Sequence, residues 1–140
     1  MDTDIREFLL DIILNHTDEG VASIDAHGIF TYYNERMSAI EGLNQEEVIG
    51  KYILDIYPTF NLKNSTMIET LRVGKPIFNV EQRYVNNKVK EIVSLITDVP
   101  IIKDGKVEGV VEFVKDIDTI KNLYGLTNHL KKKSITLKIA

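Results

Sequence analysis

The stretch VASIDAHGIFTYYNERMSAIEG, residues 21–42, places two short runs of β-branched and aromatic residues around a tight turn. Such runs, at residues 21–25 and 29–34, predict two strands. Between them, Asp25 can accept backbone hydrogens of its own turn, and Gly28 can adopt the positive φ that the turn requires. The stretch therefore predicts a hairpin with a connection of three or four residues.

The hairpin leads directly into helical spacing. Asn34 stands where the strand pattern ends, so it predicts an N-cap, and Gly42 predicts the C-terminal end of this short helix. The spacing from Asn44 to Glu47 resembles a capping box, and it predicts a second short helix that ends at Gly50.

Helical spacing also occurs on either side of this region. Residues 5–14 place apolar side chains at intervals of three and four, which predicts an amphipathic helix. Its apolar stripe packs either on the sheet of this domain or on the same helix of a second copy. Residues 52–60 form an apolar, proline-containing connection without clear periodicity, and residues 62–73 predict a helix that stops at Gly74.

From Pro76 onward the apolar pattern changes to a period of two. It predicts three strands, at residues 77–85, 89–99 and 106–117, joined by turns at Asn86-Asn87 and Asp104-Gly105. After residue 118 the helical spacing returns.

This order predicts an α+β fold in which a five-stranded antiparallel sheet carries short helices on one face. We expect the two-strand hairpin to lie beside the last strand, a small cavity between sheet and helices, and flanking helices at both ends. The predicted organisation is an N-terminal amphipathic helix at residues 1–18, a core at 19–118 and a C-terminal helical linker at 119–140, leading toward an output domain that this chain lacks.

Composition narrows the function. With 17 basic and 21 acidic residues, the formal charge of −4 argues against direct nucleic-acid contact. The absence of cysteine excludes disulfides and thiolate metal sites. No apolar run is long enough for a membrane span, and the residues after Met1 lack the basic region of a signal peptide, so we expect a cytoplasmic protein.

Six short motifs in this order resemble the PAS domain family, over about residues 19–118. They are Gly20-Val21 with Asp25, Gly28 and Asn34; Gly42 with residues 46–51; Gly74-Lys75-Pro76; Pro100-Ile101 before the Asp104-Gly105 turn; Gly109-Val110-Val111; and Lys115-Asp116-Ile117.

The resemblance implies a non-enzymatic sensory module, and no catalytic set is visible in the chain. A flavin photoreceptor of the adduct-forming class is excluded because there is no cysteine. Haem is not expected, because none of His16, His27 and His129 falls in the helix that would supply the ligand. No metal site is expected. Any ligand is expected to be a small, noncovalent metabolite, and the alternative is a domain without a ligand.

The resemblance also suggests which residues line a ligand pocket, although the same side chains can simply fill the core. The candidates are Ile24, Tyr32, Met37, Ile40, Ile56, Tyr57, Met67, Leu71, Val80, Arg83, Ser94, Ile96, Val111 and Phe113. Arg83 could clamp a carboxylate. The signal is expected to leave through Asp116 and Ile117, because Asp116 can cap the following helix.

Three contexts fit a PAS sensor of this kind. The chain most resembles the N-terminal sensor of a bacterial sigma-54-dependent transcriptional activator. The alternative is the PAS sensor of a histidine kinase or a diguanylate cyclase. An alternative of another class is a ligand-free dimerisation module, and a homodimer is expected in either case.

Overall fold

The computed structural model describes residues 3–117, together with Lys121 and Gly125. The helices are α1 (Thr3–His16), α2 (Glu35–Glu41), α3 (Gln45–Val48), α4 (Ile53–Ile56) and α5 (Thr66–Val73). The strands are β1 (Gly20–Asp25), β2 (Phe30–Tyr33), β3 (Ile77–Val85), β4 (Glu91–Lys103) and β5 (Lys106–Asp116). The expected C-terminal helix, with His129, lies outside the described residues except at those two positions.

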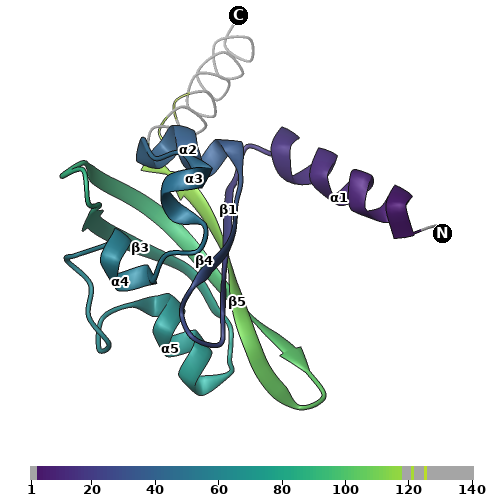
Figure 1. Cartoon of the computed structure of the whole chain (residues 1–140). Helices are drawn as coiled ribbons and strands as arrows, with labels where there is room; N and C mark the ends of the chain where they lie inside the picture. The colour runs from purple at the N-terminus through teal and green to yellow at the C-terminus, as the bar shows by residue number, and fades with distance from the viewer. Residues whose placement is uncertain (1–2, 118–120, 122–124, 126–140) are drawn as a thin grey trace, which may run out of the picture.

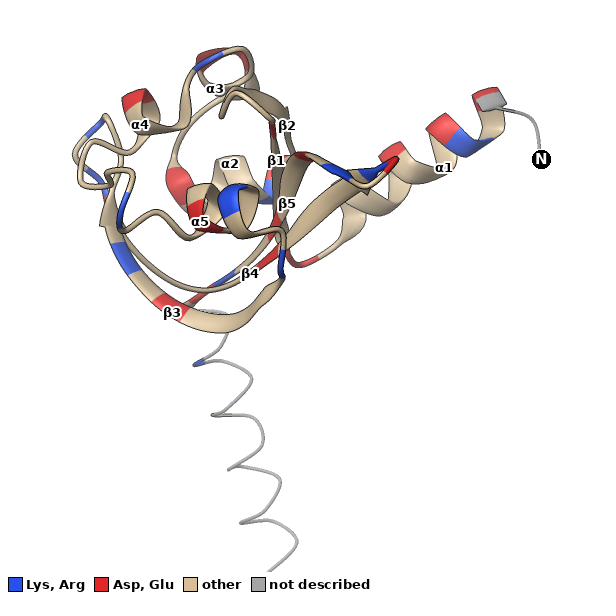
Figure 2. Ribbon diagram, turned by 90° about the horizontal axis from the view of Figure 1, so that it is seen from below, with Lys and Arg blue, Asp and Glu red and all other residues tan. Residues whose placement is uncertain are grey.

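The strands form one antiparallel sheet in the order β2-β1-β5-β4-β3. The predicted fold class is confirmed, as is the place of the hairpin beside the last strand. Short helices cover one face of the sheet (Figure 1). Seen from below, β3 and β4 curve around α2 and α5, whereas α1 projects away from the sheet (Figure 2).

The hairpin and the helix after it form as their sequence predicts. Asp25 Oδ1 accepts hydrogen bonds from the backbone of His27 and Ile29 at 2.8 and 3.1 Å. Asn34 Oδ1 accepts one from the Met37 amide at 2.9 Å, which caps α2. The Asn34 side chain also donates to the Leu14 carbonyl at 2.6 Å, so the same residue holds the end of α1 against the hairpin.

The strand predicted at residues 89–99 is β4 at Glu91–Lys103, and two differences lie between residues 52 and 73. The connection at residues 52–60 contains a short helix, α4. The next helix begins at Thr66 rather than at residue 62, because Asn61 and Asn64 bond to each other's backbone amides in a turn and Ser65 then accepts from the Ile68 amide at 3.3 Å. These local bonds compete with the helix and delay its start.

The hydrophobic core fills the space between the helices and the inner face of the sheet. Alternate strand residues reach it, and on the central strands these include Ile92, Ile96, Val110 and Val114, each at most 4% exposed. Burying side chains of this size stabilises the fold by about 1.5 to 3 kcal/mol each. Several polar residues share this face with the apolar ones.

Candidate functional site

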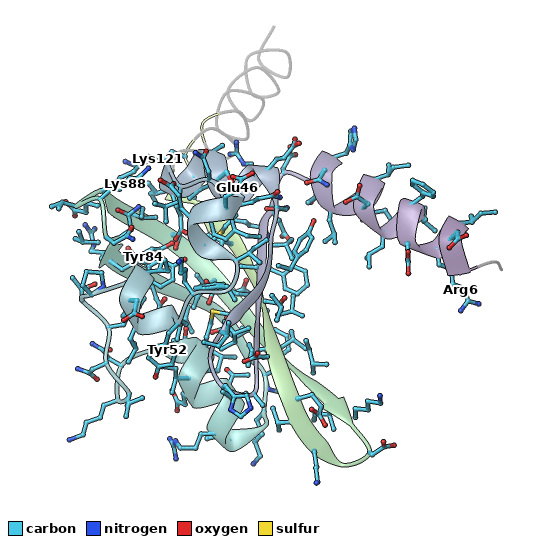
Figure 3. All side chains as sticks on the ribbon, viewed as in Figure 1. Arg6, Glu46, Tyr52, Tyr84, Lys88 and Lys121 are labelled. Carbon is cyan, nitrogen blue, oxygen red and sulfur yellow. The ribbon has the colours of Figure 1, made fainter. Side chains whose placement is uncertain are left out.

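A buried carboxylate lies at the C-terminal end of α2. Glu41 is 0% exposed, and its two oxygens accept hydrogen bonds from three tyrosines. Tyr33 and Tyr57 donate to Oε1 at 2.5 and 2.7 Å, and Tyr84 donates to Oε2 at 2.6 Å. Figure 3 places Tyr84 on the helix-covered side of the sheet. This cluster joins α2, β2, the end of α4 and β3.

Protonation in this cluster follows from its burial. Burial raises the pKa of Glu41, and the three phenol hydrogen bonds and the charge of Lys90 oppose that rise. Burial also raises the pKa of Tyr33, Tyr57 and Tyr84, and the nearby Glu41 adds to it. The phenols therefore stay protonated and remain hydrogen-bond donors.

A second buried acidic cluster lies on the neighbouring strands β4 and β5. Asp98 of β4 and Glu112 of β5 stand opposite each other in the antiparallel ladder, and they are 0% and 7% exposed. Burial raises the pKa of Glu112, with a further rise from the Asp98 charge. Burial also raises the pKa of Asp98, and the adjacent Glu112 and Thr66 side chains offset part of that rise.

Several buried polar atoms of β4 and α5 lack a partner. Neither carboxylate oxygen of Asp98 receives a hydrogen bond, and the same holds for the hydroxyls of Thr70 on α5 and Ser94 on β4. All three residues are at most 1% exposed. Because buried polar groups in folded proteins are nearly always hydrogen-bonded, such a concentration of unpartnered atoms is unusual.

Next to Glu112 is a small cavity of about 10 Å³, which is room for about one water molecule. It is lined by Ile53, Tyr57, Phe60, Ser65, Thr66, Met67, Gln82, Tyr84 and Glu112. In this structure side chains therefore close the space between sheet and helices to anything larger than a single small group.

Most of the predicted pocket residues lie on the inner side of the sheet. Those buried there are Ile24, Met37, Ile40, Ile56, Tyr57, Met67, Ser94 and Ile96. Leu71 and Val80 are partly buried against the same core. Tyr57 and Met67 line the small cavity.

Four of the predicted pocket residues lie outside the interior, where we expected the pocket. Tyr32, Val111 and Phe113 lie on the opposite face of the sheet. The reason is the pleat: Val110, Glu112 and Val114 are the inward residues of β5, so their neighbours point outward. The Arg83 side chain is 69% exposed and lies 3.9 Å from Glu81, so it clamps nothing in the interior.

That opposite face forms an apolar groove with α1. The groove has a volume of about 570 Å³ and is lined by Glu7, Leu10, Asp11, Leu14, Val21, Ser23, Tyr32, Ile101, Val111 and Phe113. The helix beside it exposes large apolar side chains, namely Ile5, Phe8, Leu9, Leu10, Ile12 and Ile13, each 46 to 71% exposed. Figure 3 shows Arg6 near the far end of α1, well away from the sheet.

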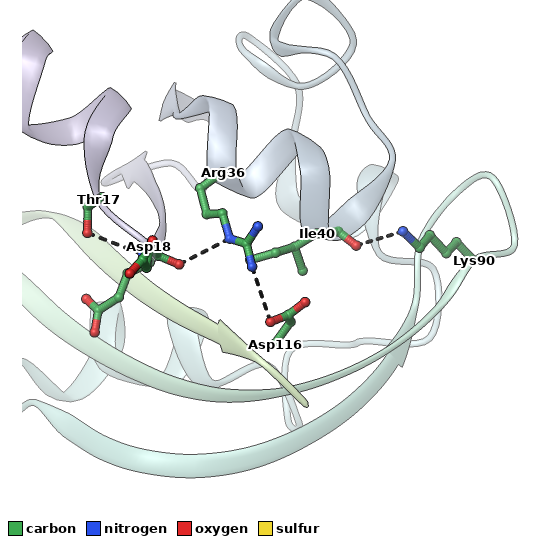
Figure 4. Close-up of polar contacts among 7 residues, drawn as sticks. Thr17, Asp18, Arg36, Ile40, Lys90 and Asp116 are labelled. Carbon is green, nitrogen blue, oxygen red and sulfur yellow. Dashed lines mark hydrogen bonds and ion pairs between the residues drawn. The ribbon is translucent and has the colours of Figure 1, made fainter. Parts of the chain in front are cut away.

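The predicted signal exit lies where both flanks of the domain meet. Arg36 of α2 donates from Nε to the Asp18 carbonyl at 3.1 Å, and its Nη2 lies 3.5 Å from Asp116 Oδ1 (Figure 4). The helix that Asp116 was expected to cap falls almost entirely on residues outside those that the structure describes. Half-buried Ile117 lines a small surface hollow with Ile40 and Lys90.

The acidic clusters were missed at the sequence level. A usable signal was present in β4, where Asp98 continues the inward series of Ile92, Ser94 and Ile96. Glu112 likewise stands between two inward valines on β5. An acid at an inward position of an otherwise apolar strand indicates a polar interior. Glu41 carried no such signal, because it lies in the short helix between Asn34 and Gly42.

Within the described part of the chain, no helix is long and apolar enough to cross a membrane. The same residues contain no group of three or more histidine, cysteine, aspartate or glutamate side chains placed to hold a metal ion.

The strand order, the single layer of short helices and the enclosed polar site define an α+β domain of the sensory type. Residues 18–119 match the PAS domain. The chain belongs to the PAS domain family.

One relative and two solved structures illustrate the likeness. The transcriptional activator RocR of Bacillus subtilis (strain 168) is 33% identical over 135 residues, which cover 96% of this chain but 29% of RocR. The E. coli DhaR(N)-DhaL complex contains a chain with a TM-score of 0.67 at 20% identity, covering 82% of this chain and 37% of that one. The PAS domain of a protein from Colwellia psychrerythraea has a TM-score of 0.67 at 16% identity, covering 81% of this chain and 98% of that one. The two structures show the fold alone.

Proposed function

We propose that this chain is the cytoplasmic PAS sensor of a sigma-54-dependent transcriptional regulator. It binds a small molecule on the inner face of its sheet and passes the bound state to a C-terminal output domain. The observation that carries this proposal is the 33% identity to a transcriptional activator over 96% of the chain. Because the match covers 29% of that relative, the remainder of such a protein has room for an output domain.

The geometry supplies a route for the signal. Glu112 lines the interior cavity and Asp116 contacts Arg36, and both residues belong to β5. A ligand that changes the position of this strand therefore changes the joint from which the chain leaves the domain. Arg36 also donates a hydrogen bond to the Asp18 carbonyl, so a movement of Asp116 that shifts Arg36 also shifts the N-terminal flank.

The test is a reporter assay in the full-length protein with the sigma-54-dependent promoter it controls. Output should depend on the stimulus in the intact protein and become independent of it when residues 1–117 are deleted. An unchanged, stimulus-dependent output after the deletion contradicts a sensory role. An output domain with kinase or cyclase activity identifies the alternative, a histidine kinase or diguanylate cyclase sensor.

We also propose that the domain forms a homodimer through α1 and the outer face of the sheet. The support is that one chain carries both an exposed apolar helix and, beside it, an apolar groove. In a twofold-symmetric dimer each helix can cover the groove of the other copy, so both surfaces are satisfied by one contact. This dimer is compatible with ligand binding on the inner face of the sheet. If the domain binds no ligand, the dimer contact is its function, which is the alternative of a ligand-free dimerisation module.

A further inference from the structure

The interior of this domain holds an acid pair that no basic side chain balances. Asp98 and Glu112 are buried side by side, and no lysine, arginine or histidine among the described residues forms an ion pair with either. Removing a carboxylate from water is costly unless a partner compensates it. The third buried acid, Glu41, differs because three tyrosines satisfy its oxygens.

The atoms around the acid pair indicate what kind of partner is missing. Both oxygens of Asp98 lack a donor, and the hydroxyl of Thr70 on α5 lacks a partner. A group with several N–H donors and a positive charge would satisfy all of these acceptors at once. Ammonium offers three donors and guanidinium five, whereas a water molecule brings two donors and no charge.

We propose that this site binds a compact organic cation, whose ammonium or guanidinium head lies between Asp98, Glu112 and the threonines of α5. The proposal rests on the sensory function proposed above and names the class of ligand. An anionic ligand is disfavoured in this acidic interior, and a neutral one cannot form an ion pair with Asp98 or Glu112.

The cavity beside Glu112 and Thr66 has a volume of about 10 Å³, so it must widen to admit the head of such a ligand. Its walls include the apolar side chains of Ile53, Phe60 and Met67, which can pack on methylenes. Phe60 belongs to the connection between α4 and α5, whose residues 61–64 are exposed. The Val85 amide of β3 donates a hydrogen bond to Thr59 Oγ1 of this connection at 3.3 Å. Displacing Phe60 therefore opens the site without breaking the sheet.

The test is thermal melting of the purified chain with small probes of matched size at constant ionic strength. The cations are butylammonium chloride and butylguanidinium chloride, and the controls are 1-butanol and sodium pentanoate. At least one cation should raise Tm in a saturable, concentration-dependent way, and neither control should. The cation with the larger rise identifies the preferred head group. No rise with either cation, or an equal rise with 1-butanol or pentanoate, overturns the proposal.

Substitutions locate the effect. Glu112→Gln and Asp98→Asn keep the shape of each side chain but remove its charge, and each should weaken cation binding about tenfold or more. Glu108→Gln, at an exposed position of the same strand, should leave it unchanged. The two buried variants should melt no lower than the wild type without ligand, so lost binding cannot be attributed to misfolding. Cation binding that survives in both of them contradicts the proposal.

Failure of this proposal can be told apart from failure of the sensory function. If Glu112→Gln in the full-length protein responds to its stimulus as the wild type does, the cation site is wrong while the sensor stands. If deletion of residues 1–117 leaves the stimulus response intact, the sensory function itself is wrong.

Discussion

Glu112 and Asp116 lie on the same face of β5, and β4 contacts both, since Asp98 is paired with Glu112 and Ser94 with Asp116. The buried acid pair and the exit joint are therefore connected by one pair of strands, the two with the longest ladder in the sheet. Because backbone hydrogen bonds make such a ladder stiffer than a loop, we expect a change at one end to reach the other.

Asp116→Ala in the full-length protein should reduce the stimulus response while leaving the fold largely intact. The two side chains of the Arg36–Asp116 pair are 34% and 23% exposed, so its loss should cost about 1 kcal/mol or less of unfolding free energy. A shift of this size can still change a two-state equilibrium severalfold. The measurement is a reporter assay with and without stimulus, together with a melting curve of the domain.

Arg36→Ala should behave in the same way, because it removes the other partner of the pair. Lys115→Ala provides the matched control: it removes the neighbouring contact of Lys115 with Glu19, 3.3 Å long, but leaves Asp116 in place. If Asp116→Ala keeps the full response, the joint is only a linker and the proposed route is wrong.

Glu112→Gln should make stability less dependent on pH. The folded-state pKa of Glu112 lies well above its ordinary value of 4.5, so the folded protein holds this proton more tightly than the unfolded chain does. The unfolding free energy of the wild type should therefore fall as the pH rises from the ordinary glutamate range toward the raised folded pKa. Asp98 and Glu41 contribute in the same direction.

Urea denaturation at a series of values from about pH 5 to about pH 8 measures this effect. The variant should be more stable than the wild type at the upper end and should show a shallower decline. Glu108→Gln, at an exposed position, is the control and should follow the wild-type curve. A wild type that gains stability with rising pH over this range would show that the acid pair is stabilised as anions.

The tyrosine cluster predicts a difference between two similar substitutions. Tyr84→Phe removes the donor that Glu41 Oε2 receives at 2.6 Å and should cost about 1 to 3 kcal/mol, because a buried acceptor loses its partner. Tyr32→Phe removes a hydroxyl that has no hydrogen-bond partner and should be close to neutral. Equilibrium denaturation of both variants compares them. Equal effects would mean that the phenol–carboxylate bonds add nothing beyond packing.

The sequence predicted the fold well because its strongest signals are local. The Asn34 side chain caps the start of α2, and Gly42 ends the helix with a positive φ. The period-two pattern from Pro76 onward defines the meander. The outward position of Tyr32 and Phe113 depends on which residue of each strand starts the inward series, and a shift by one residue reverses every side chain. The clustering of Glu41 with Tyr33, Tyr57 and Tyr84 depends on contacts between distant segments, which no local pattern encodes.

Leu10→Glu should convert the proposed dimer to monomer without unfolding the domain. Leu10 lines the groove and is 57% exposed in the single chain, so a charge there costs little within the monomer but would be buried in the dimer contact. Sedimentation equilibrium of the wild type should show a dimer that Leu10→Glu disrupts, with a nearly unchanged Tm at low protein concentration. Ile102→Glu, an exposed apolar position at the far end of β4 that does not line the groove, is the matched control and should leave the dimer intact. A wild type that stays monomeric, or a Leu10→Glu variant that stays dimeric, would show that α1 and the outer face of the sheet do not form the dimer interface.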